Sequence, residues 1–327
     1  MALRLSQDLH LDPPVFLAPM AGITDLPFRE LVASFGAGLV VSEMVASQEI
    51  VQARPGVREK AELGYGVENT AVQLAGRDPY WMGEAARMVA ANGARMIDIN
   101  MGCPARKVVG GMSGSALMRD LDHALTMIEA TVAAVDIPVT LKTRLGWDDD
   151  LMNAPDLARR AEGAGIAMVT IHGRTRCQFY KGRANWAAIK PVKDAVSIPV
   201  IANGDILGPT EAKTALEHSN ADGVMIGRGA GGRPWILAQV AAALYNTPAP
   251  VVPQGKARAD LVARHYEASL GFYGAEIGKR VIRKHLGWYM DDAETPSALR
   301  REMLSAAEPK TVLRLIPEAL ESAQEAA

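Results

Sequence analysis

The sequence has only two cysteines, few aromatic residues and no long apolar run. Two cysteines in 327 residues, Cys103 and Cys177, exclude a disulfide scaffold and are typical of a reducing compartment. Residues 1–11 carry no apolar signal core, and no stretch approaches the roughly 20 apolar residues of a membrane span. A net charge of −2 excludes a basic field over the whole molecule. We therefore expect a soluble, cytoplasmic protein whose nucleic-acid contacts, if any, come from a local patch.

Several motifs of binding and catalysis are also missing. No Gly-x-Gly-x-x-Gly follows the first predicted strand, which disfavours a Rossmann fold. The six histidines are dispersed, and neither His-Glu-x-x-His nor Cys-x-x-Cys is present, so no metal site is predicted. The nucleophile elbow Gly-x-Ser-x-Gly of serine hydrolases is absent as well.

What the sequence does contain is a regular alternation of short apolar runs with helical patterns. One helix is expected over residues 28–35 with Thr24 as its N-cap. Strands that alternate with helices form a parallel sheet, and eight such units in about 240 residues favour a closed (β/α)₈ TIM barrel within the α/β class. The eight predicted strands cover residues 15–19, 39–42, 70–74, 96–100, 138–142, 167–172, 199–202 and 222–226.

The pattern changes after residue 245. Residues 246–254 contain three prolines, which predicts a linker between domains. Beyond it the apolar residues follow helical spacing and no strand is expected. We therefore predict a barrel domain over residues 1–245 and a small all-helical C-terminal domain over residues 255–327.

The fourth predicted strand ends abruptly in Gly102-Cys103-Pro104. Glycine frees the backbone and proline prevents regular pairing, so this break leaves the Cys103 thiol on a loop after the strand. A free cysteine is most often a small buried hydrophobic residue. In parallel α/β proteins, however, the chemistry lies at the carboxyl ends of the strands, so the position of Cys103 favours a catalytic role.

The last two predicted strands end in glycine-containing loops at residues 201–205 and 225–229. Loops at these places in TIM barrels commonly bind phosphate through backbone N–H groups and a helix N-terminus. Glycine also ends many strands without binding anything. Two such loops in succession, the second with the cation Arg228, predict a phosphorylated cofactor.

Polar residues also close the other predicted strands. Lys142 is costly to place at a barrel mouth without an anionic partner or an electron-rich ring. His172 ends the sixth strand, where a satisfied core histidine is the other interpretation. Gln73 and Asn100 carry amides that can donate and accept across a planar heterocycle. Asp98 lies within its strand and is interpreted as structural.

A basic segment lies in the predicted helical domain. Lys279 and Arg283, and also Arg280 and Lys284, are four residues apart, so all four share roughly one side of a helix. A solvated helix face is one interpretation. Contact with the phosphates of an RNA is the other, and Arg106 and Lys107 beside the Cys103 loop would extend that surface.

Together these motifs resemble the tRNA-dihydrouridine synthase family, most closely the DusB subgroup. The resemblance covers almost the whole chain, and Asn-Met-Gly-Cys-Pro at residues 100–104 is its most specific motif. The other matching segments are residues 18–25, 41–44, 139–142, 171–175, 201–205, 225–228 and 279–289.

The resemblance implies an FMN enzyme that reduces uridine in the D-loop of tRNA to 5,6-dihydrouridine, with NADPH as reductant. Hydride would pass from flavin N5 to C6 of the uracil, and Cys103 matches the proton donor to C5. Asn100 matches a residue that holds the uracil. The positions that match FMN contacts are Met20, Ala21, Gly22, Gln73, Lys142, His172, Asn203, Gly204, Asp205, Gly227 and Arg228.

Two alternatives remain open. An FMN barrel that acts on a free pyrimidine, as dihydroorotate or dihydropyrimidine dehydrogenases do, would explain the barrel and Cys103 but not the basic helical segment. A non-catalytic RNA-binding protein would explain the basic segment alone. No role is assigned to Cys177, and a monomer without metal is expected.

Overall fold

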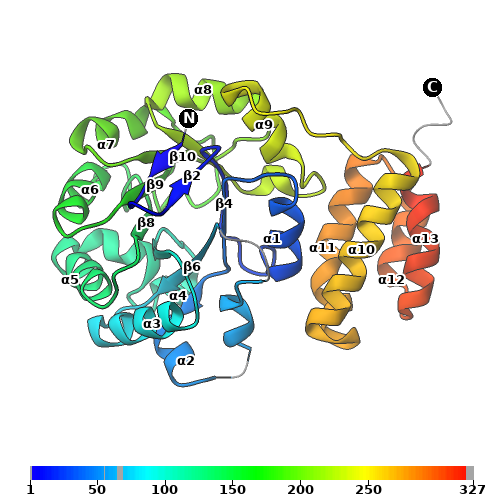
Figure 1. The fold of residues 1–327 in the computed structure, drawn as a ribbon, viewed down its shortest axis with the longest axis horizontal. Coiled ribbons are helices and arrows are strands. Elements are labelled where there is room, and N and C mark those ends of the chain that lie inside the picture. The colour runs from blue at the N-terminus through cyan, green and yellow to red at the C-terminus, as the bar shows by residue number, and fades with distance from the viewer. Residues whose placement is uncertain (1, 55, 65–68, 322–327) are drawn as a thin grey trace.

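The computed structural model describes residues 2–54, 56–64 and 69–321. Eight parallel strands form a ring, because β4 pairs with both β3 and β6 and the remaining neighbours follow one another back to β3. The predicted closed (β/α)₈ barrel is confirmed (Figure 1). The ring strands are β3 (Val15–Leu17), β4 (Leu39–Val41), β6 (Thr70–Ala75), β7 (Ile97–Met101), β8 (Val139–Arg144), β9 (Met168–His172), β10 (Val200–Asn203) and β11 (Gly223–Ile226).

The strands are buried on both faces, as expected for a parallel sheet covered by helices. All six residues of β6 and all six of β8 are buried. Around the ring lie α1 (Leu26–Ala33), α3 (Pro79–Ala91), α5 (Leu121–Val132), α6 (Ala154–Gly163), α7 (Lys190–Ala195), α8 (Pro209–Ser219) and α9 (Ile236–Tyr245). Shorter insertions are β5 (Val45–Ala46), α2 (Ser47–Val51) and α4 (Arg106–Val109).

The start of α1 corrects one expectation. Asp25, and not Thr24, caps this helix, since the Asp25 carboxylate accepts from the Phe28 N–H at 3.1 Å. The Thr24 hydroxyl is engaged one turn earlier, where it accepts from the Met20 N–H at 2.8 Å. A local side-chain bond thus competes with capping, and the helix that was predicted over residues 28–35 spans Leu26–Ala33.

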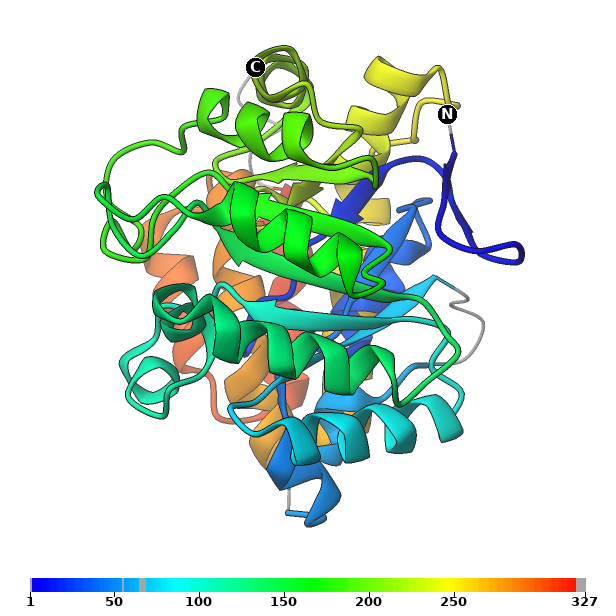
Figure 2. The same cartoon turned by 90° about the vertical axis from the view of Figure 1, so that its left-hand side faces the viewer.

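A short N-terminal hairpin closes one end of the barrel. It is formed by β1 (Leu3–Arg4) and β2 (His10–Leu11) and is drawn in blue in Figures 1 and 2. Leu3, Leu9 and Leu11 pack with side chains of the barrel interior, among them Phe16 and Met225. The interior is therefore filled with apolar side chains on this side, and the polar strand residues gather toward the other end.

The C-terminal region is helical, as predicted. It consists of α10 (Gly255–Tyr273), α11 (Ala275–Asp292), α12 (Ser297–Ser305) and α13 (Pro309–Glu321), which lie beside the barrel in Figure 1. These helices share a core of their own, separate from that of the barrel. The described chain has no helix or strand between Tyr245 and Gly255. The exact division into domains stays a prediction, and residues 322–327 lie outside the described part.

Helix α11 is seated directly on the barrel. The His285 ring packs against Phe28 of α1 in a tilted arrangement, 4.4 Å between centroids, and its Nε2 lies 3.1 Å from the Ile23 carbonyl oxygen. Trp288 packs against the loop after β11 so closely that a Cβ on Gly231 would lie 2.8 Å from its ring. These contacts hold one face of α11 at the edge of the barrel. Among the described residues, no helix combines the length and apolarity needed to cross a membrane.

Candidate active site

A cavity of about 590 Å³ opens at the carboxyl ends of the barrel strands. Every one of the eight ring strands contributes a lining residue from its end or from the turn that follows it. This is the place where TIM barrels carry their chemistry. In strand order these residues are Ala18, Met44, Gln73, Asn100, Lys142, His172, Asn203 and Gly227.

The half-buried Cys103 lines the cavity on a loop that is held from both sides. Before it, the Asn100 side-chain oxygen accepts from the N–H groups of Gly102 at 3.2 Å and of Cys103 at 3.0 Å. After it, the Cys103 carbonyl accepts from the Ser115 N–H at 3.1 Å and from its hydroxyl at 2.9 Å. These bonds fix the backbone that carries the thiol.

Lys142 projects from β8 into the same cavity. Its Nζ donates to Asn203 Oδ1 at 2.9 Å, and Asn203 in turn donates to the Met225 carbonyl at 2.8 Å. Burial lowers the pKa of Lys142 to about 8, although the nearby Asp98 acts in the opposite direction. The amine is therefore still mainly a cation at neutral pH, and Asn203 Oδ1 is its one hydrogen-bond acceptor among the described residues. Such a group stabilises negative charge on a bound ligand.

His172 lies at the end of β9 as a neutral base. Burial, together with the charges of Lys142, Arg144 and Arg174, holds its pKa well below the usual range. Its Nε2 lies 3.3 Å from Arg174 Nη1, and because a guanidinium only donates, Nε2 is the acceptor and Nδ1 carries the hydrogen.

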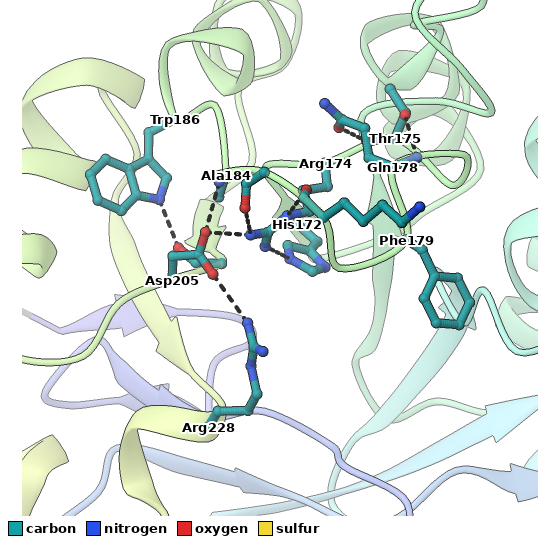
Figure 3. A network of polar contacts seen from close by, with 12 residues as sticks. His172, Arg174, Thr175, Gln178, Phe179, Ala184, Trp186, Asp205 and Arg228 are labelled. Atoms are coloured by element: carbon teal, nitrogen blue, oxygen red, sulfur yellow. Dashed lines mark hydrogen bonds and ion pairs between the residues drawn. The ribbon is translucent and has the colours of Figure 1, made fainter.

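Asp205 joins two arginines at the rim (Figure 3). It accepts from Arg174 Nη2 at 2.5 Å and from Arg228 Nη2 at 3.2 Å, and the Ala184 N–H donates to it at 2.8 Å. Burial raises the pKa of Asp205, but the hydrogen bonds from Arg174 and Ala184 outweigh it and the pKa is lowered overall. Arg174 is 2% exposed, whereas 62% of the Arg228 side chain is exposed. Arg228 is thus the arginine free to meet a ligand.

The same rim offers backbone donors. Within the described residues, no protein group accepts from the N–H groups of Gly204, Gly227 or Arg228. Gly204 is buried and has a φ of +116°, a conformation that side chains disfavour, and a Cβ there would lie 2.7 Å from the His172 ring. Free N–H groups on two adjacent loops and the Arg228 guanidinium are donors of the kind that bind a phosphate.

The structure gathers most of the predicted site residues and separates a few. All the predicted cofactor contacts line the cavity except Gly22, whose N–H instead donates to the Glu43 carboxylate. Arg106 and Lys107 are exposed on α4 but do not line the cavity.

The basic residues of α11 have different surroundings. Lys284 and Trp288 line the cavity edge, and Arg280 and Arg283 are exposed. Lys279 is held elsewhere, because its Nζ donates to Glu276 at 2.9 Å and to the Ala307 carbonyl at 3.1 Å.

Two arginines of the site, Arg144 and Arg174, were not predicted from the sequence, and both are almost fully buried. Arg144 lines the cavity and donates to the carbonyls of Gly102, Thr175 and Phe179 at 2.8–3.0 Å. It also lies over the Tyr180 ring, 5.5 Å from the centroid. Alternation along the strand was the available signal, since Arg144 follows Lys142 by two residues and so points to the same side.

Known proteins with similar sequences point to one family. A family model described as dihydrouridine synthase matches residues 16–325. The chain is 60% identical over 321 residues to a probable tRNA-dihydrouridine synthase of Rhodobacter capsulatus, with 98% of each chain covered. It is 47% identical over 290 residues to tRNA-dihydrouridine synthase B of Vibrio cholerae, covering 88% of this chain and 89% of that protein.

Solved structures show the same fold at low identity. A morphinone reductase aligns with a TM-score of 0.54 and 15% identity, covering 79% of this chain and 93% of that one. The match of the family model over nearly the whole chain and the two close relatives settle the family, and the barrel supplies the expected architecture. The chain is an enzyme of the dihydrouridine synthase family.

Proposed function

We propose that this enzyme reduces uridine to 5,6-dihydrouridine in the D-loop of tRNA. The observation that carries the proposal is the Cys103 thiol, held on a fixed loop at a cavity that also contains the buried cation Lys142. Reduction of the uracil C5=C6 bond needs a hydride donor, a proton donor and a group that stabilises negative charge. The names of the relatives from R. capsulatus and V. cholerae support the same substrate.

The residues at the rim fit FMN. The N–H groups of Gly204, Gly227 and Arg228, with the Arg228 guanidinium, suit its phosphate. Met20, Ala21, Gln73, Lys142, His172, Asn203 and Asp205 would hold or surround the rest of the cofactor. Gly22 would act by shaping the turn that carries Met20 and Ala21. When bound, FMN supplies the hydride, from N5 to C6 of the uracil, and NADPH is the proposed reductant.

Cys103 would donate the proton to C5. A thiol can give up a proton near neutral pH, which an aliphatic hydroxyl does not readily do. Asn100 is restricted to one role toward the base, because its oxygen already accepts two backbone N–H groups. One hydrogen of its Nδ2 goes to Gln73 at 2.8 Å, so the other is left to donate to a uracil carbonyl.

The tRNA would be held by cations around the cavity. Lys284 at its edge and the exposed Arg280 and Arg283 offer contacts to phosphates from α11, and Arg106 and Lys107 offer them from α4. Lys279 is engaged with Glu276 and Ala307 and is a weaker candidate. The target base must leave its stack to reach Cys103 at the strand ends. Trp288 lies at the cavity edge, where such a base would enter.

The direct test is the reaction of the purified protein, loaded with FMN and supplied with NADPH, on unmodified tRNA and on free uridine in parallel. We expect dihydrouridine at a D-loop position of the tRNA and none from the nucleoside. Turnover of free pyrimidine with no product in tRNA would instead favour the small-molecule alternative. Binding of tRNA without flavin uptake and without turnover would favour a non-catalytic RNA-binding protein.

A further inference from the structure

A row of polar side chains runs across the barrel interior, and two of its members, Gln73 and Asn100, line the cavity. Asp98 on β7 accepts from Gln73 Nε2 on β6 at 2.7 Å and from the Thr140 hydroxyl on β8 at 2.7 Å. Gln73 Oε1 accepts from Asn100 Nδ2 at 2.8 Å. All four side chains are buried, and Asp98 is only 3% exposed. Through Asn100 the row reaches the N–H groups of Gly102 and Cys103.

The direction of donation along this row is fixed at both ends. The two backbone N–H groups can only donate, so they require the oxygen of the Asn100 amide. The Nδ2 of Asn100 must then face Gln73, whose Oε1 accepts, and the Nε2 of Gln73 is left facing Asp98. The row therefore needs an acceptor at position 98.

We propose that Asp98 is a positioning residue, which sets the direction of the hydrogen bonds through Gln73 and Asn100 and thereby holds the backbone of the Cys103 loop. This inference rests on the proposed function only for its catalytic consequence. Without an acceptor at 98, the Gln73 N–H stays buried and unpaired. If the Gln73 amide flipped, its Nε2 would face the Nδ2 of Asn100, so that two donors would meet. Asn100 would then have to turn and release the N–H groups of Gly102 and Cys103.

The row requires an acceptor oxygen at position 98 but not a charge. Burial raises the pKa of Asp98, while the hydrogen bonds from Gln73 and Thr140 and the charge of Lys142 act in the other direction. A proton on Oδ1 would leave Oδ2 to accept from Gln73. An asparagine would do the same, because its Nδ2 could face Thr140, whose hydroxyl then donates to the Ile97 carbonyl, 3.4 Å away.

Asp98→Asn keeps an acceptor oxygen and removes the charge, whereas Asp98→Ala removes both. The two variants therefore separate the need for an acceptor from the need for a charge. Amide hydrogen exchange is the readout, measured by mass spectrometry on a peptide that spans residues 100–104. Because the first two residues of a peptide lose their label and Pro104 has no N–H, the signal comes from Gly102 and Cys103. We expect exchange at least about tenfold faster in Asp98→Ala, since the bonds to Asn100 are lost, and within about threefold of the wild type in Asp98→Asn.

Thr131→Val is the matched control for a general loss of stability, because it also removes a buried hydrogen bond. Thr131 is a buried residue of α5 whose hydroxyl donates to the Met127 carbonyl at 2.7 Å, away from the row. It should leave exchange at Gly102 and Cys103 unchanged. If Asp98→Ala does not fold, Asp98→Val replaces it, because valine also lacks an acceptor.

Turnover on tRNA provides the second readout. Asp98→Ala should lower kcat about 100-fold through misplacement of the thiol, with KM within about threefold, and Asp98→Asn should restore most of it. Wild-type exchange in Asp98→Ala, or equally fast exchange in the Asn variant, overturns the proposal. If the wild-type enzyme reduces no uridine in tRNA, the proposed function fails, while the exchange rates still decide the role of Asp98.

Discussion

The ion pair between Asp205 and Arg174 allows a quantitative prediction about stability. The Asp205→Asn substitution keeps the size of the side chain and its tolerance of a φ of +52°, but removes the charge that faces a buried guanidinium. Breaking a buried pair on one side costs about 3–5 kcal/mol. Arg174 retains the carbonyls of Lys181 and Gly182, and Asp205 is partly exposed, so we expect a loss of about 2 kcal/mol.

Urea denaturation of the purified protein at pH 7 measures this loss as a change in the free energy of unfolding. The matched control is Asp194→Asn, which breaks an exposed pair with Lys190, where both side chains are more than half exposed. That control should cost less than about 0.5 kcal/mol and should lose its effect in 1 M salt. Equal losses in the two variants, or a salt-sensitive loss in Asp205→Asn, would mean that the burial of Arg174 does not determine the strength of this ion pair.

Two further substitutions test the site and its support. Gly204→Ala places a Cβ 2.7 Å from the His172 ring at a φ of +116° and should weaken FMN binding at least about tenfold in a fluorescence titration, because strain and overlap act on the same loop. Gly36→Ala is its control, with a φ of +96° and open space around the new methyl group. Asp25→Asn retains the cap of α1 but removes a carboxyl whose pKa is raised to about 6, chiefly by burial. Because the folded protein binds that proton more tightly than the unfolded chain does, the stability of the wild type relative to Asp25→Asn should rise by about 2 kcal/mol as the pH falls from 6 to 4. A constant difference across that range would contradict the assignment.

The barrel could be predicted because its strands are buried on both faces. Such strands read as short apolar runs, and their regular alternation with helices leaves few other architectures. The hairpin of β1 and β2 was missed because strands of two residues carry no pattern. Thr24 was a reasonable cap by residue type, but its hydroxyl is bonded to the Met20 N–H, which only the folded turn reveals.

Site residues at strand ends could be predicted from the sequence. Site residues held by contacts with distant loops could not. Cys103 and Lys142 lie at strand ends, which sequence order brings to one edge. Arg174 escaped notice because the carbonyls that accept from it belong to Lys181 and Gly182 on a loop without a motif. Helical spacing placed Lys279 with Arg283, but it does not show that the chain after α12 reaches back to Lys279.

The hydrogen-bond partners of Asp98 inside the barrel could not be predicted either. Asp98 was interpreted as structural because it lies within a strand, and its side chain is buried there. Its contacts with Gln73 and Thr140 depend on the register between three strands, and the sequence does not contain that register. Only the paired strands bring these side chains together, and the hydrogen bonds then follow from their chemistry.

The most direct test of the account is the dihydrouridine content of tRNA after reaction with the FMN-loaded Cys103→Ala enzyme and NADPH. We expect FMN and tRNA to bind as in the wild type, since the Cys103 side chain makes no described hydrogen bond, and turnover to fall about 100- to 10,000-fold with loss of the proton donor. Wild-type yields of dihydrouridine from Cys103→Ala would contradict the assignment of Cys103, and with it the central claim about this cavity.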